Sequence, residues 1–84
     1  MLAVLKGVVI DVERLRREIV ADRMGATIAR ELGIARSYLY RKLSGGVAMS
    51  LKDLNRICRI YGRSATEFLK EIDLADADLE RKAA

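Results

Sequence analysis

The sequence predicts a single all-α domain of five helices, and three features of its composition support that prediction. Its 84 residues suffice for one small domain but not for two independently folded ones. Apolar residues make up 51% of the chain and charged residues 33%, which favours a packed core over disorder. Proline is absent and aromatic residues make up only 5%, so helices are favoured over a β sandwich with its many turns.

Residues 1–10 are expected to form an apolar N-terminal arm ahead of the helices. The stretch LAVLKGVVI within it is rich in β-branched residues and is interrupted by Gly7. Ten residues cannot build a sheet alone. The arm is therefore a short β-strand that pairs with its copy in a second subunit, an apolar segment packed across the helices, or a mobile tail. Val4 and Val8 are its candidate dimer contacts.

The first three helices are expected at about 12–23, 26–32 and 36–44. Asp11 suits the N-cap of the first, because its side chain can accept a hydrogen bond from a free backbone N–H. Gly33 suits the left-handed position that ends the second. Their apolar residues recur at helical spacing: Val12, Leu15, Ile19, Ile28, Ala29, Leu32, Leu39 and Leu43.

Two further helices are expected to start at capping boxes. Ser50 with Asp53 begins the fourth, which Gly62 ends, and Ser64 with Glu67 begins the fifth. The apolar residues expected to face the core are Leu51, Leu54, Ile57 and Tyr61 in the fourth helix and Phe68, Leu69 and Ile72 in the fifth. Residues 74–84 then form an acidic C-terminal tail.

The charge distribution points to a polyanionic partner. The net charge is +4, and residues 36–63 carry seven basic side chains against Asp53 alone. Residues 71–84 carry five acidic side chains against two basic ones. A basic stretch of this kind is typical of a nucleic-acid-binding surface. The alternative is a charged surface that serves only to keep the chain in solution.

Composition also excludes several classes of chemistry. The chain has no histidine and one cysteine, Cys58, so it has no disulfide framework, no Cys/His metal site and no His-based triad. It also lacks a glycine-rich phosphate loop, and we expect no enzyme, no cofactor and no metal. No apolar run approaches the roughly 18 residues of a membrane span, so we expect no membrane partner and a cytoplasmic, nucleoid-associated location.

Residues 28–45, IARELGIARSYLYRKLSG, predict a helix-turn-helix, because two short helices flank a turn that contains glycine. Ala29 is small enough for the helices to cross closely, and Ile34 fills the space between them. Leu39 and Leu43 lie close together on a helical wheel and press the third helix onto the core. Its remaining arc is polar and basic, which suits a major groove.

On these residues the chain resembles the lambda-repressor-like, Xre/Cro group of DNA-binding domains. The resemblance spans about residues 15–72 and implies a five-helix DNA-binding domain over 11–73, with a recognition helix at about 36–44. The motifs that carry it are Ile28-Ala29, Leu32-Gly33-Ile34, Arg36-Ser37-Tyr38-Leu39, Leu43-Ser44-Gly45 and Met49-Ser50-Leu51, followed by Leu54, Ile57, Gly62 and Glu67-Phe68-Leu69. Residues 39–43 also resemble the Fis-type motif, but that motif closes its chain, whereas two more helices are expected here.

The resemblance implies DNA contacts from the recognition helix and its surroundings. The candidate base-contacting residues are Arg36, Ser37, Tyr40 and Arg41. The candidate phosphate-contacting residues are Arg17, Tyr38, Ser44, Gly45, Gly46 and Lys52. The chain departs from the family at Ala35, where a Ser or Thr cap is usual, and at Gly25, where a phosphate-contacting Gln is frequent.

We therefore expect a sequence-specific regulator of double-stranded DNA, in particular a small repressor of the phage or mobile-element type. A homodimer would read a pseudo-palindromic operator. Its contacts would come from the arm (Val4 and Val8) or from the fifth helix (Phe68 and Ile72). The alternative is an antitoxin that binds a toxin protein and autoregulates its operon.

Overall fold

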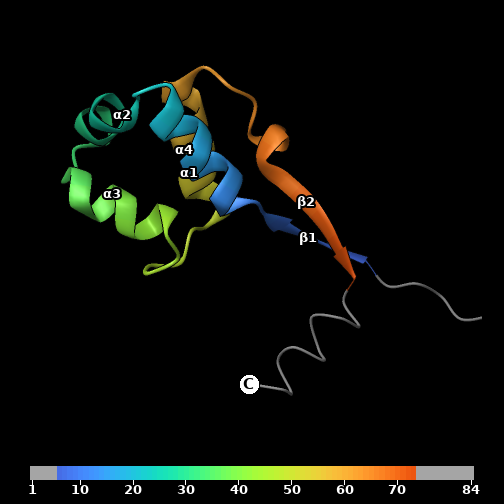
Figure 1. Cartoon of the computed structure of the whole chain (residues 1–84). Coiled ribbons are helices and arrows are strands. Elements are labelled where there is room, and N and C mark those ends of the chain that lie inside the picture. Colours follow the sequence, from blue (N-terminus) through green and yellow to red (C-terminus); the bar gives the residue numbers. More distant parts are fainter. Residues whose placement is uncertain (1–5, 74–84) are drawn as a thin grey trace, which may run out of the picture.

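A computed structural model describes residues 6–73. Its elements in chain order are β1 (Lys6–Ile10), α1 (Val12–Ala21), α2 (Gly25–Leu32), α3 (Arg36–Leu43), α4 (Leu51–Tyr61), a 3-10 turn η1 (Ala65–Phe68) and β2 (Leu69–Asp73). The four helices form one body, and β1 and β2 form a two-stranded antiparallel ribbon that projects from it (Figure 1). The helices α2 and α3 lie at the end of the body remote from the ribbon (Figure 1).

Helix boundaries follow the capping residues of the sequence. The Asp11 side chain accepts a hydrogen bond from the Arg14 N–H at the start of α1. Both bonds of the capping box between Ser50 and Asp53 are formed at the start of α4. Gly33 and Gly62 end α2 and α4 with φ of 71° and 77°, a left-handed conformation that costs glycine little. The N-cap, the capping box and both glycine ends are confirmed.

One apolar core joins the four helices to η1. Its buried members are Leu15, Ile19, Ile28, Ala29, Leu39, Leu43, Leu54, Ile57, Cys58 and Phe68. The apolar spacing of the sequence thus marks the buried side of each helix, except at Leu51, which was expected to face the core but is 60% exposed in the first turn of α4. Cys58 is 2% exposed, and burial raises the pKa of its thiol. A buried, protonated thiol acts as a small apolar side chain.

The prediction of a fifth helix is wrong. The capping box of Ser64 and Glu67 forms, but it starts only the 3-10 turn η1, and the chain then extends into β2. A short helix gains little from its own hydrogen bonds, whereas residues 69–73 gain a full ladder of strand pairing with β1. Phe68, one of the two dimer contacts expected on that helix, is 0% exposed and packs inside its own chain. Ile72 lies in β2 opposite Gly7, and a dimer contact from it stays a prediction.

Part of the predicted arm, residues 6–10, forms the strand β1, which pairs with β2 of the same chain. The register pairs Lys6 with Asp73, Val8 with Glu71 and Ile10 with Leu69. At the base of the ribbon the Asp11 N–H donates to the Phe68 carbonyl oxygen at 2.6 Å. Residues 6–10 are therefore tied to the end of η1 and are not a separate arm. The expected contact at Val4 and the acidic tail at 74–84 lie outside the described residues.

Candidate nucleic-acid interface

The turn between α2 and α3 fixes the direction of the candidate recognition helix. Gly33 turns the chain, and the Ile34 N–H donates to the Ala29 carbonyl oxygen at 3.0 Å. Leu39 and Leu43 are fully buried, so α3 is held against the core along one side. Ala35 at the N-cap makes no side-chain hydrogen bond. The position of α3 therefore depends on packing rather than on its cap.

The opposite side of α3 is exposed and basic. Arg36, Ser37 and Arg41 are all exposed. Neither guanidinium has a carboxylate partner among residues 6–73. Arginine is well suited to forked contacts with phosphate or guanine. The structure thus brings three of the four predicted base-contacting residues to one surface, with both charges available.

Tyr40, the fourth predicted base-contacting residue, is half-buried against the start of α2. A Cβ added at Gly25 would lie 2.8 Å from the Tyr40 ring carbon Cζ, closer than real Cβ atoms approach. The ring therefore occupies the space that a side chain at position 25 would need. A side chain at position 25, where the Xre-like pattern has Gln, would therefore displace the ring, and the present position of the ring commits much of Tyr40 to packing.

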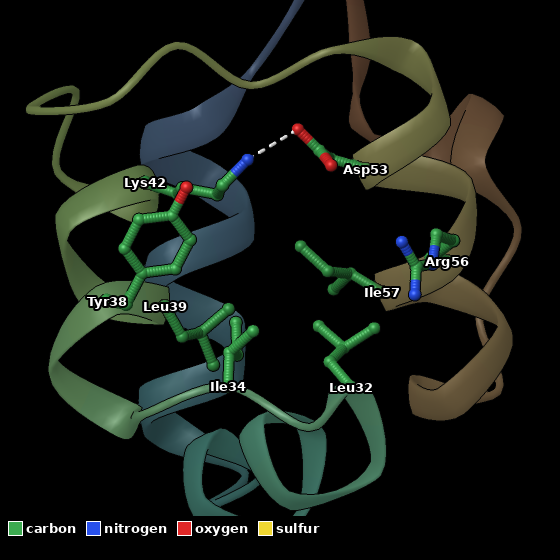
Figure 2. A pocket seen from close by; sticks show the side chains of 8 residues that line it. All are labelled: Leu32, Ile34, Tyr38, Leu39, Lys42, Asp53, Arg56 and Ile57. Carbon is green, nitrogen blue, oxygen red and sulfur yellow. Dashed lines mark hydrogen bonds and ion pairs between the residues drawn. The ribbon is translucent and has the colours of Figure 1, made fainter.

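A small cavity separates α3 from α4 (Figure 2). Its volume is about 220 Å³, and its apolar lining comes from Leu32, Ile34, Leu39 and Ile57. Across its opening, Lys42 Nζ lies 2.7 Å from Asp53 Oδ2, the contact drawn as a dashed line in Figure 2. The Lys42 ammonium also lies 5.5 Å from the centre of the Tyr38 ring.

The Lys42–Asp53 ion pair was not expected from the sequence. The ammonium, together with the Ser50 N–H, holds the pKa of Asp53 below its usual value, and the carboxylate raises the pKa of Lys42. Asp53 thus caps α4 and binds α3 at the same time. Tyr38 is 38% exposed beside this pair, and a phosphate contact from it stays a prediction. The only sequence feature that could have indicated this ion pair is Asp53 itself, the single acidic residue in the basic stretch 36–63.

The backbone amides of two predicted phosphate-contacting residues, Gly45 and Gly46, donate hydrogen bonds within the chain. The Gly46 N–H donates to the Arg41 carbonyl oxygen at 2.8 Å, and the Gly45 N–H donates to the Lys42 carbonyl oxygen at 3.3 Å. Both amides therefore complete the end of α3 and are not free to bind a phosphate. The Ser44 hydroxyl is exposed but already donates to the Arg41 carbonyl oxygen at 3.3 Å.

The remaining phosphate candidates lie on α1 and α4. Arg17 and Lys52 are both exposed, Lys52 in the first turn of α4. A shallow depression between the start of α1 and the end of α3 is lined by Arg16 and the acidic Glu13 together with Ser44 and Gly45. Arg16 is thus the α1 cation beside the end of α3. Arg16 was not among the residues predicted from the sequence, although it is the neighbour of Arg17 on the helix.

A second ion cluster lies on the ribbon side of the body. Arg63 Nη2 lies 2.8 Å from Glu18 and 3.1 Å from Glu67, and Arg14 Nε lies 2.8 Å from Glu18. The guanidinium of Arg63 lowers the pKa of both Glu18 and Glu67. This cluster joins α1 to η1, so these two arginines stabilise the fold and do not belong to the basic surface of α3.

The cluster predicts a loss of stability in acid. Because Glu18 and Glu67 have folded-state pKa values below their ordinary 4.5, they stabilise the fold above that pH, and the contribution disappears as pH falls through the lowered values. The thermal midpoint should therefore fall progressively as the pH drops below 4.5. The variant Glu18→Gln/Glu67→Gln should show a flatter dependence in circular dichroism melts. The exposed Glu31→Gln should follow the wild type, and equal slopes in all three would contradict the prediction.

Four helices, with the second and third joined by a short glycine turn and the third bearing an exposed basic side, define a helix-turn-helix-type domain. The chain matches the model of the BetR domain over residues 8–78. It therefore belongs to the BetR domain family, a family of small helix-turn-helix-type DNA-binding domains. No curated protein and no solved structure matches it.

Residues 6–73 contain neither a membrane-spanning helix nor a cluster of metal-binding side chains. No helix in this range is long and apolar enough to cross a membrane. Over the same residues, no three His, Cys, Asp or Glu side chains come together as a group that could hold a metal ion.

Proposed function

We propose that this chain is a sequence-specific transcriptional regulator of the Xre/Cro type, a small repressor that binds a pseudo-palindromic operator as a dimer and has no enzymatic activity of its own. The BetR domain family supports the DNA-binding role. Such a repressor would act by occupying a promoter, because a bound dimer excludes other proteins from the same stretch of duplex.

The observation that carries the proposal is the contrast between the arginines of the molecule. Arg14 and Arg63 form ion pairs with carboxylates of the same chain. Arg36 and Arg41 are exposed on a helix whose other side is locked into the core. A rigid helix that presents two uncompensated guanidiniums can enter a major groove and form bidentate contacts with guanine bases.

In this proposal Arg36, Ser37 and Arg41 contact the bases. Tyr40 contributes only through the part of its ring that packing leaves accessible. Arg16, Arg17 and Lys52, which lie on α1 and α4, contact the phosphate backbone of the DNA. Phosphate contacts give affinity and register, whereas base contacts give sequence preference.

Selection of bound sites from random duplexes tests the proposal. The expected product is an inverted repeat whose half-sites are about 34 Å apart, one helical turn. Affinity for the selected site should fall steeply with salt, and the site should keep an advantage of at least about a thousandfold over random duplex. A chain that binds all duplexes equally, or binds none, would reject the proposed function.

A further inference from the structure

The ribbon leaves apolar surface and strand edges uncovered. Each strand is paired on one side only among the described residues. A two-stranded ribbon is marginal by itself, and an unpaired edge is a template for another strand. Val8 in β1 is 63% exposed, the highest value among the large apolar residues of residues 7–72. This part of the molecule therefore needs a partner more than any other apolar surface described here.

The uncovered surface is continuous with the helical body. Alternation along the strands places Val8, Ile10 and Leu69 on one side of the ribbon, together with Glu71, the cross-strand partner of Val8. That side borders a groove of about 430 Å³ whose lining is entirely apolar: Val8, Val9, Ile10, Val12, Met49, Leu51 and Leu69. Leu51 at its far wall is 60% exposed. A strand added beside β1 would bury part of the exposed Val8 side chain at the border of this groove.

Charge decides which strand edge can meet a second copy. In an antiparallel pair related by a twofold axis through the sheet, a central residue faces its own copy. An axis at Lys70 or Glu71 of β2 sets like charges opposite each other, and an axis at Ile72 sets Glu71 against the second copy's Asp73. Like charges directly opposite destabilise a pair. The middle of β2 is therefore a poor edge for a symmetric partner.

The β1 edge has no such conflict. An axis at Val8 pairs Val8 with the second copy's Val8, Gly7 with its Val9, and Lys6 with its Ile10. All five residues of β1 are then paired, and no charge meets its like. Apolar and β-branched pairs across strands stabilise a sheet.

We propose that two copies of this chain join through β1 in a four-stranded antiparallel sheet of order β2–β1–β1–β2, with the twofold axis at Val8. The proposal rests on the dimer of the proposed function and names its interface. The copies of Asp11 then lie about 20 Å apart along the strands. Each helical body occupies one end of the sheet, so the two recognition helices address separate half-sites.

Cysteine cross-linking without DNA tests the interface. The Cα atoms of facing residues in an antiparallel pair lie about 4.5–5.5 Å apart, within the range of a disulfide. Val8→Cys should therefore form a covalent dimer under mild oxidation, to more than about half of the chain. The matched control is Glu71→Cys on β2, whose two copies lie about 14 Å apart and should not join. The wild type, with its buried Cys58, should stay uncross-linked.

Sedimentation of two uncross-linked variants completes the test. Val8→Lys sets two ammonium groups opposite each other and should raise the dimer dissociation constant at least about tenfold, while Val8→Thr should change it little. Cross-linking at Glu71 instead of Val8, or a wild-type chain that stays monomeric at all concentrations, would overturn the proposal. A monomer that instead captures a toxin protein on this groove would also overturn it. The selection of DNA sites reports separately on the proposed function, since one body can still bind a half-site.

Discussion

Replacing Arg41 with alanine is expected to weaken binding to the selected operator about 10- to 100-fold while leaving the thermal midpoint unchanged. The side chain is exposed and has no ion-pair partner among residues 6–73, so its removal costs the fold nothing. A bidentate contact from arginine to guanine provides about 1–3 kcal/mol of discrimination. Titration of labelled operator at fixed salt measures the loss, and the same titration on random duplex should show a much smaller one.

The matched control is Arg59→Ala, which removes the same charge from the last turn of α4. It should lower affinity no more than about threefold, because the charge lost lies on α4 and not on the exposed side of α3. A selected operator that the Arg41→Ala protein binds with wild-type affinity and wild-type sequence preference would remove Arg41 from base recognition.

Replacing Phe68 with alanine is expected to be the most destabilising single change. The ring is fully buried, and the guanidinium carbons of Arg14 and Arg63 lie 5.4 and 5.3 Å from its centre. Deleting a buried aromatic ring costs about 3–5 kcal/mol, a large part of the total stability of a small domain. The thermal midpoint should fall by roughly 15 °C or more.

Two companion variants separate the lost core volume from other effects. Phe68→Leu keeps most of the volume and should recover more than half of the loss in midpoint. Val20→Ala removes an apolar side chain that is 52% exposed and should change the midpoint by only a few degrees. A Phe68→Ala protein as stable as Val20→Ala would show that η1 is not part of the core.

Helix positions were predictable from the sequence because capping and apolar spacing act locally. Ser50, Asp53, Gly33 and Gly62 each mark a boundary through an interaction within a few residues. The buried side of each helix followed from spacing alone, as at Leu39 and Leu43. The candidate site was predictable for the same reason. Arg36 and Arg41 lie outside the arc of the helix that Leu39 and Leu43 occupy, so burying the two leucines leaves the two arginines exposed.

The ribbon was not predictable, because its cause is a pairing between residues about sixty positions apart. The capping box at Ser64 is a true local signal, but it cannot show whether one turn or three will follow. The bond from Asp11 to the Phe68 carbonyl, and the ladder beyond it, decide that outcome. The Lys42–Asp53 pair escaped prediction for the same reason, since it depends on how two helices are placed in space.

The close approach of Tyr40 to Gly25 has a consequence for how relatives of this chain can diverge. Any side chain acquired at position 25 requires the ring at position 40 to shrink or turn away. Because position 40 borders the surface proposed to read bases, a change of phosphate anchor at one site alters the reading surface at the other. These two positions should therefore change together in evolution, so that contacts to the DNA phosphates and preference for a base sequence change together.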